Sequence, residues 1–293
     1  MRVLVSGASG LVGSALVPAL ESAGHSVVRL VRRDPAANEI RWDPAGGIAA
    51  GALEGFDAAV HLAGESIAGR WTAAKKARIR DSRVQGTRTL AAALAGAAQR
   101  PKVMVCASAI GIYGDRGDEV LREESAPGSD FLAEVSQQWE AATEPAARAG
   151  MRVVSLRFGV VLSRRGGALA QMLPPFRMGA GGRIGSGRQW MSWITLDDVV
   201  GVIQHALATD SLRGPVNTVA PTPVTNAEFT RALGEALHRP TIFPLPAFMV
   251  RLMFGEMGDA LLLGSQRVDC GKLQASDFRF RHPELQPALQ ALL

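Results

Sequence analysis

The stretch Met1-Arg-Val-Leu-Val-Ser-Gly-Ala-Ser-Gly-Leu-Val-Gly13 opens the chain and decides its fold. Residues 3–5 predict a strand, and the glycines that follow predict a turn into a helix. Gly7 permits the tight turn, Gly10 has no Cβ to hold a pyrophosphate away, and Gly13 lets the helix pack close to the strand. The start of the helix then offers free N–H groups and a partial positive charge. The stretch therefore predicts a site for a phosphate-bearing dinucleotide.

The bulk composition is that of a globular α/β protein. The chain has 293 residues, of which 47% are hydrophobic and 20% charged, and this suits one large domain with a smaller lobe. Its two cysteines, Cys106 and Cys270, give neither a disulfide framework nor a metal-ligand spacing, so we expect a reducing cytoplasm and no metal site. We find no signal peptide and no apolar run of the ~18 residues that a membrane helix needs, so we expect no membrane partner.

The net charge of +5 raises the question of a nucleic-acid partner. The basic residues are dispersed, and the densest part, residues 75–88, alternates with apolar residues at helical spacing. This pattern is typical of a solvated helix face. We therefore expect no nucleic acid, and sites for small anionic molecules instead.

The second predicted strand points to a particular cofactor. Residues 26–31 form an almost continuous apolar run, which is typical of a parallel sheet buried on both faces. An NAD site normally has a carboxylate near here for the ribose 2′-hydroxyl. Arg32 and Arg33 follow the strand instead, and two guanidiniums can bind a 2′-phosphate. The positive charge of these two arginines favours NADP(H) over NAD(H). The alternative is that both are solvated surface residues that bind no cofactor.

Strands alternate with helices through the first 160 residues, which predicts a doubly wound parallel α/β sheet of the Rossmann type. We expect an NADP-binding domain over residues 1–163, with a return segment at about 192–220. A smaller α+β C-terminal lobe for the substrate is expected from residues 164–191 and 221–293. Residues 38–55, rich in glycine, predict a loop with at most a short hairpin.

Three motifs resemble the extended branch of the short-chain dehydrogenase/reductase (SDR) superfamily. Residues 6–13 resemble its TGAxGxxG opening, His61-Leu-Ala-Gly64 its HxAG element, and Arg83-Val-Gln-Gly-Thr87 its NxxGT pattern with Arg83 in place of Asn. We expect His61 to be structural, because nothing acidic in the sequence is poised to orient it. Together with the charge argument, the resemblance implies an NADP(H) site made by Gly7, Ser9, Gly10, Leu11, Val12, Gly13, Arg32, Arg33, Leu62, Ala63, Gly64, Arg83, Ala107 and Ser108.

The usual acid–base residues of that superfamily are absent. Its SSxxVYG motif reads Ser108-Ala-Ile-Gly-Ile-Tyr-Gly114 here, so Ser108 stands at the first Ser of the motif and Ala109 at the second, catalytic Ser. Its YxxxK motif falls on Phe131 and Val135. Tyr113 is the only tyrosine of the chain, so the pair has not simply shifted along the sequence.

The pattern resembles an atypical SDR group, the epimerase-family or nucleoside-diphosphate-sugar-epimerase-like proteins, over essentially the whole chain. Sugar-nucleotide enzymes of the superfamily often carry an Arg for the diphosphate at a position that is Met191 here. The group name implies sugar-nucleotide epimerisation, but the missing proton-transfer residues do not fit that reaction in its standard form.

Two functions remain open. The first is an NADP(H)-dependent oxidoreductase or epimerase-like enzyme on a small carbonyl or sugar-nucleotide-like substrate, with Ser108 and Tyr113 as candidate catalytic residues and Glu65 and Glu134 as further proton donors. The second is an NADP(H)-binding sensor or scaffold without catalysis. We favour the enzyme. The resemblance also implies a homodimer formed through helices at 71–94 and 131–149.

Overall fold

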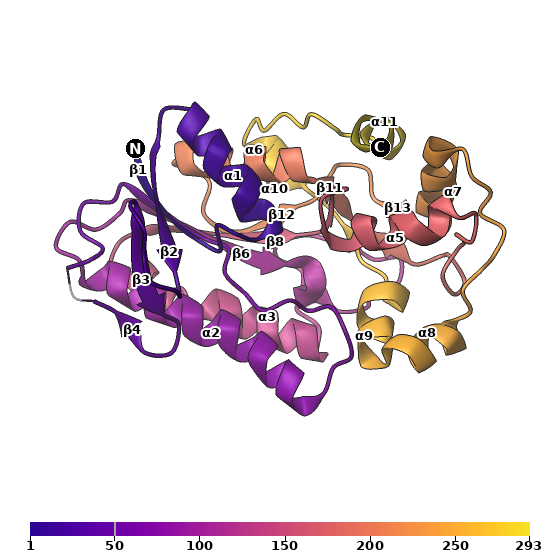
Figure 1. Ribbon diagram of the computed structural model, residues 1–293, viewed down its shortest axis with the longest axis horizontal. Helices are drawn as coiled ribbons and strands as arrows, with labels where there is room; N and C mark the ends of the chain where they lie inside the picture. Colours follow the sequence, from indigo (N-terminus) through magenta and orange to yellow (C-terminus); the bar gives the residue numbers. More distant parts are fainter. Residues whose placement is uncertain (50) are drawn as a thin grey trace.

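The computed structural model describes residues 1–49 and 51–293, and most of its strands join one sheet. These strands are β1 (Arg2–Ser6), β2 (Ser26–Val31), β3 (Glu39–Asp43), β4 (Gly47–Ile48), β5 (Ala58–His61), β6 (Val103–Ala109), β8 (Arg152–Phe158) and β12 (Gly214–Thr218). Their order is β12-β8-β6-β5-β1-β2-β3-β4 (Figure 1), and every pair is parallel except β3 with β4. The predicted doubly wound α/β fold is confirmed.

Helices cover both faces of this sheet (Figure 1). Helices α1 (Leu11–Ser22) and α6 (Leu196–Ala208) share one core with Val3 and Val5 of β1. Helices α2 (Ala73–Gly96) and α3 (Phe131–Ala141), with the short α4 (Glu144–Arg148), lie on the other face, where α2 and α3 share a core with Leu4. Successive residues of a strand point to opposite faces, so an unbroken apolar strand serves both cores at once.

The second lobe is built on its own small core. Helices α5 (Gly167–Arg177), α7 (Asn226–Leu237) and α11 (Leu285–Leu292) pack around Trp193 and Phe229. The lobe also contains α8 (Ala247–Phe254), α9 (Glu256–Gly258) and a π-helical turn η2 (Asp259–Leu263). Helix α10 (Gly271–Ala275) returns to the large sheet, where its Leu273 joins the core beneath α1 and α6. The remaining elements are the 3-10 turn η1 (Ile110–Tyr113) and three strand pairs, β9 (Val160–Leu162) with β11 (Trp193–Thr195), β10 (Trp190–Met191) with β13 (Val224–Thr225), and β7 (Val120–Leu121) with β14 (Arg267–Val268).

The prediction of a loop over residues 38–55 is wrong for its first part. Residues 39–43 form β3, a further parallel strand beside β2. Its residues alternate polar and apolar, and Trp42 is buried against the α2 face of the sheet. This alternation is the signal for a half-buried strand, and the surrounding glycines obscured it. The short hairpin is present, because β4 pairs antiparallel with β3.

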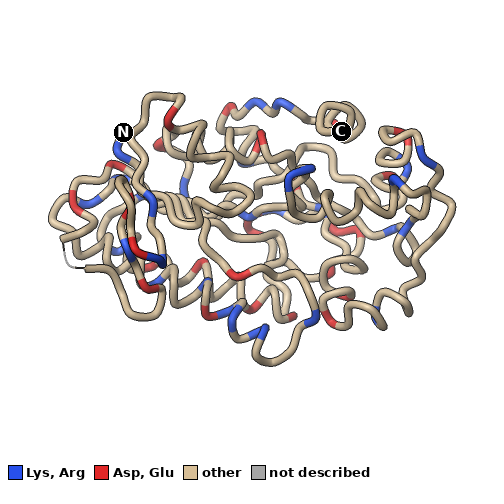
Figure 2. Tube along the Cα trace, viewed as in Figure 1, with Lys and Arg blue, Asp and Glu red and all other residues tan. Residues whose placement is uncertain are grey.

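Figure 2 shows Lys and Arg distributed along the chain among Asp and Glu. Helix α2 is the densest basic segment, with six Lys and Arg residues and one acidic residue, Asp81. No helix among the described residues is long and apolar enough to cross a membrane. No group of three or more potential metal-ligating side chains is found in residues 1–49 and 51–293.

Candidate functional site

The glycine turn after β1 has the geometry that the sequence predicts. Gly7 has φ +73°, and a Cβ there would lie 2.6 Å from the carbonyl carbon of Leu62. A Cβ on Gly13 would lie 2.2 Å from the oxygen of Gly7, so only glycine lets α1 approach the turn this closely. Gly10 has one neighbour, the oxygen of Gly7 at 3.3 Å, and is otherwise open. The turn thus presents open backbone to a ligand.

The first turn of α1 is left free for an anion. Its N-cap, Gly10, has no side chain to satisfy the N–H groups, and the turn contains no acidic residue. By contrast, α3, α6 and α7 are each capped by a side chain, from Asp130, Thr195 and Thr225. An uncapped helix start with exposed Ser9 and Gly10 before it suits a phosphate.

The segment after β5 packs directly on this turn. Leu62 and Ala63 contact Gly7, so the predicted cofactor residues of β1 and β5 are brought together. Arg83 of α2 lies over the neighbouring Gly64, with its guanidinium carbon 3.4 Å from the place of a Cβ there. Its guanidinium donates to the carbonyls of Glu65 and Ile79 and stacks on Trp139. Burial lowers the pKa of Arg83 to about 10, against the opposing effect of the Glu65 charge, so it remains a cation.

The two arginines after β2 have different surroundings. Arg33 donates to the carbonyl of Asp34 at 2.8 Å and to Glu39 Oε1 at 2.7 Å. Arg32 is exposed and has no side-chain hydrogen bond or ion pair to the described residues. Of the two arginines, Arg32 therefore has the guanidinium that is available to a 2′-phosphate, because the Arg33 guanidinium is bound to the Glu39 carboxylate.

We predict that Arg32→Ala weakens NADPH binding about tenfold or more and leaves NADH binding unchanged, because a charge-assisted hydrogen bond is worth about 1.5–3 kcal/mol. Fluorescence titration of both cofactors measures this. Arg33→Ala is the matched control, because that guanidinium already pairs with Glu39, and a smaller effect is expected. Equal losses of NADPH and NADH in the Arg32 variant would contradict the assignment.

His61 is fully buried at the end of β5. Its Nδ1 shares a hydrogen bond with Ser6 Oγ at 2.5 Å, and its ring meets Trp42 edge-on. Its Nε2 has no partner among the described residues. Burial lowers the pKa of His61 to about 4, so the ring is neutral at physiological pH. This environment favours the structural role expected from the sequence.

Ser108 and Tyr113 both belong to one buried network. The Ser108 hydroxyl donates to Glu140 Oε1 at 2.7 Å. Arg157 donates to both oxygens of Glu140, at 2.8 and 2.9 Å, and to the Tyr113 hydroxyl at 2.8 Å. Tyr113 in turn donates to Asn217 Oδ1 at 2.6 Å. The network therefore joins β6, η1, α3, β8 and β12 below the carboxyl ends of the strands.

This network limits what the two candidate catalysts can do. Tyr113 is fully buried, and its hydroxyl both donates and accepts within the protein. Burial is the main cause that raises the pKa of Tyr113. Ser108 is 2% exposed and its proton points to Glu140. Their catalytic roles stay predictions, and their surroundings favour positioning over proton transfer to a substrate.

The other proton donors considered from the sequence are no better placed. Glu65 Oε1 accepts from Lys75 Nζ at 2.7 Å, and this hydrogen bond is the main cause that lowers the pKa of Glu65. A carboxyl so held is ionised at neutral pH and is a poor acid. Glu134 is exposed on α3. Val135, at the position of the usual lysine, is buried, so the structure offers no substitute there.

Glu140 and Arg157 are the residues that the sequence analysis missed. The signal was present, because Arg157 stands in the apolar strand β8 and a buried guanidinium requires a partner. Burial alone would lower the pKa of Arg157, but the hydrogen bonds and charge of Glu140 outweigh it and raise that pKa.

A cavity of about 310 Å³ opens where the two lobes meet at the start of α3. Phe131, at the position of the superfamily's tyrosine, forms part of its wall and meets Trp71 at 5.3 Å between ring centroids. The π-helical turn η2 forms the opposite side, and such turns are frequent at functional sites. The lining residues are Trp71, Asp115, Asp130, Phe131, Leu132, Arg251, Glu256, Asp259, Ala260, Leu263 and Gly264.

Four carboxylates line this cavity, namely those of Asp115, Asp130, Glu256 and Asp259. Glu256 pairs with Lys76 at 2.7 Å and Asp259 with Arg251 at 2.8 Å. The other two carboxylates, Asp115 and Asp130, form no ion pair in the described part of the chain and accept backbone N–H groups. The cavity therefore carries uncompensated negative charge beside an aromatic wall.

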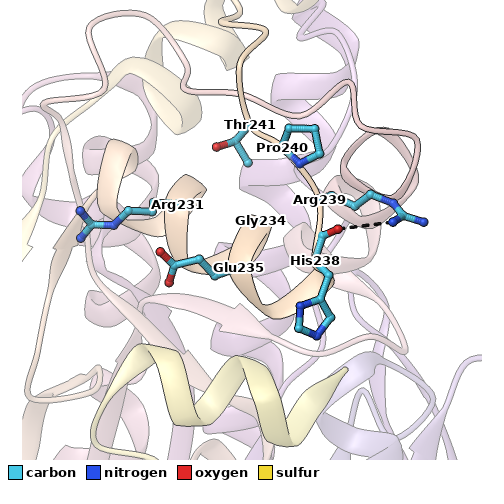
Figure 3. Close-up of a pocket in the computed structure, with 7 residues that line it drawn as sticks. All are labelled: Arg231, Gly234, Glu235, His238, Arg239, Pro240 and Thr241. Carbon is cyan, nitrogen blue, oxygen red and sulfur yellow. Dashed lines mark hydrogen bonds between the residues drawn. The ribbon is translucent and has the colours of Figure 1, made fainter.

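A second, larger hollow of about 570 Å³ lies at the end of α7. Figure 3 shows its side chains directed apart, with Arg231 and Glu235 on one side and His238 and Arg239 on the other. The dashed line joins the Arg239 guanidinium to the carbonyl of His238, its sequence neighbour. The hollow lies in the second lobe, away from the glycine turn (Figure 1), and its groups do not converge on a ligand.

Comparison with known proteins covers nearly the whole chain. A family model described as the NAD-dependent epimerase/dehydratase family matches residues 3–218, and a domain of unknown function (DUF1731) matches residues 245–292. An epimerase family protein of Mycobacterium bovis is 48% identical over 98% of this chain and 96% of its own length.

Three solved structures are also similar to this chain. The human epimerase family protein SDR39U1, crystallised with NADPH, has a TM-score of 0.93 at 38% identity, over 100% of this chain and 99% of its own. A nucleoside-diphosphate sugar epimerase from Corynebacterium glutamicum has a TM-score of 0.84 at 38% identity, and this chain covers 58% of it. UDP-N-acetylglucosamine 4-epimerase from Bacillus cereus, at 18% identity, shares the fold.

Proposed function

The chain belongs to the NAD-dependent epimerase/dehydratase family, and from this membership we propose that it is an NADP(H)-dependent oxidoreductase acting on a small carbonyl compound. The cofactor is NADP(H), which the similar human protein binds and which the open glycine turn and the free Arg32 fit. When bound, this cofactor supplies a hydride from its nicotinamide ring. The glycine turn and the start of α1 would hold its diphosphate.

The cavity beside Phe131 is the observation that carries the choice of substrate. The family resemblance puts the reacting end of the cofactor near the start of α3, and this cavity opens there. A nucleoside diphosphate needs cations, whereas this cavity has Asp115 and Asp130 without compensating charge. Its volume of about 310 Å³ matches a small ligand. A small uncharged or cationic carbonyl compound therefore fits better than a sugar nucleotide.

The proposed reaction differs from the superfamily's standard one in its proton source. The hydride adds to the carbonyl carbon and a proton adds to its oxygen, giving an alcohol and NADP⁺. Phe131 and Val135 carry no proton to donate, so water supplies it. Ser108 and Tyr113 act by positioning, since the network with Glu140 and Arg157 fixes the end of β6 beside the cofactor.

We predict that the purified protein oxidises NADPH with at least one member of a panel of neutral and amine-bearing aldehydes and ketones. UDP-glucose and UDP-glucuronate should give no turnover and no protection against heat. Loss of absorbance at 340 nm, with product analysis by mass spectrometry, measures this. Turnover of a sugar nucleotide, with none of the carbonyls, would overturn the proposed substrate class.

The alternative function is an NADP(H)-binding sensor without catalysis. One observation favours it, namely that the sole tyrosine hydroxyl is buried and saturated with hydrogen bonds. A sensor should bind NADPH tightly, turn over nothing in the panel, and change its assembly or partner binding with cofactor. Light scattering with and without NADPH separates the two functions.

The proposal also includes a cellular compartment and an oligomeric state. Burial raises the pKa of the Cys106 and Cys270 thiols to about 12, so both are unreactive and suit a reducing cytoplasm. The homodimer implied by the family resemblance would form through α2 and α3.

A further inference from the structure

The loop between β9 and α5 lies against the start of α1. Arg165 of this loop donates from Nη2 to Ser14 Oγ, in the second turn of α1, at 3.3 Å. Gly166 and Gly167 approach Leu11 so closely that a Cβ on either would lie 3.3 or 3.2 Å from the Leu11 side chain. Residues 151 positions apart in sequence are thus joined beside the glycine turn.

The charges at this junction are all positive. Both α1 and α5 begin here, with Gly10 and Gly166 as N-caps, and neither helix has a capping side chain or an acidic residue in its first turn. Each helix start therefore contributes unpaired N–H groups and partial positive charge. Arg164 and Arg165 are exposed and form no ion pair with the described carboxylates. Placing a guanidinium at a positive helix end is unfavourable unless an anion compensates both.

From this convergence we propose that Arg165 binds the diphosphate of NADP(H), and closes the β9–α5 loop over it. The diphosphate carries the only charge that the two uncapped helix starts and this guanidinium can share. Arg32 lies after β2 and addresses the 2′-phosphate, so the two arginines serve different parts of the same cofactor. The proposal rests on cofactor binding and is independent of the reaction and substrate proposed above.

The test uses four ligands that separate the phosphate groups. NADPH, NADH and ADP-ribose contain the diphosphate, whereas adenosine 2′-monophosphate contains only the 2′-phosphate. For Arg165→Ala we expect binding of the first three to weaken by a similar factor, about five- to twentyfold, with adenosine 2′-monophosphate within about twofold of wild type. Isothermal titration at fixed salt measures all four. Arg32→Ala should instead weaken NADPH and adenosine 2′-monophosphate, which carry the 2′-phosphate, and leave NADH and ADP-ribose unchanged.

Two further variants control the interpretation. Arg165→Gln keeps a polar hydrogen-bonding side chain but removes the charge, so it should bind as weakly as the alanine variant. Arg213→Ala removes a similarly exposed charge just before β12, at the opposite end of the strands, and should bind as wild type. Wild-type affinity for ADP-ribose in Arg165→Gln would overturn the proposal, as would an equal loss in Arg213→Ala. A wild-type protein that binds neither NADPH nor NADH would refute the cofactor assignment itself.

Discussion

Replacing Arg157 by methionine should lower the free energy of unfolding by about 3–5 kcal/mol, because it leaves the Glu140 carboxylate buried without its partner. The Arg157 side chain is 7% exposed and that of Glu140 18%. Arg157 also donates to the Tyr113 hydroxyl and to the carbonyl of Glu123. The loss therefore spreads through the network that joins β6, η1, α3, β8 and β12.

Urea denaturation of wild type and variants measures this effect. Tyr113→Phe is the graded comparison, since it removes one hydroxyl and should cost about 1–3 kcal/mol. The double variant Glu140→Gln with Arg157→Met should lose less than the two single losses added together, because it leaves no buried charge unpaired. A loss below about 1 kcal/mol in Arg157→Met would show that water reaches the pair and that it is not a structural anchor.

Gly13→Ala should weaken NADPH binding by roughly tenfold or more, and should also lower the melting temperature. The new Cβ would lie 2.2 Å from the Gly7 oxygen and 2.7 Å from the Ala8 Cα, and both are backbone atoms that cannot rotate away. Helix α1 must then move from the turn, and its N–H groups move with it. Fluorescence titration with NADPH and thermal denaturation give the two readouts.

Gly96→Ala is the matched control for this substitution. Gly96 lies at the end of α2, and a Cβ there would meet nothing within 4 Å. The same chemical change in open helical space should leave NADPH binding unchanged and add up to about 1 kcal/mol of stability. If the two alanines behaved alike, the close packing of α1 on the glycine turn would not be what the cofactor site requires.

The parts of the site that depend on neighbouring residues were predictable from the sequence. Gly7, Gly10 and Gly13 act within one turn, so the positive φ of Gly7 and the close approach at Gly13 follow from local spacing. The positive charge directly after β2 was predictable for the same reason, although the sequence did not show which of Arg32 and Arg33 is free of other partners. That difference depends on Glu39, in a strand hidden among glycines.

The parts that depend on distant contacts were not predictable. Tyr113 stood out as the only tyrosine of the sequence, but its hydroxyl donates to Asn217, which lies 104 residues away in sequence. Arg157 in β8 forms its ion pair with Glu140 in α3. The spacing of residues within a single helix or strand cannot predict such a pair. The contact of Arg165 with Ser14 joins the β9–α5 loop to helix α1, which only the folded topology brings together.

The order of the sheet has a consequence for the protein during its synthesis. Strand β12 pairs with β8, yet 55 residues, which contain β9, α5, β10, β11 and α6, separate them in sequence. At about 5–20 residues per second, the ribosome needs about 3–11 s to reach β12 after completing β8. Through that interval the growing chain exposes the unpaired edge of β8, which is a template for another strand. Codons that slow translation between residues 159 and 213 should therefore increase aggregation of the nascent chain, although they change no amino acid.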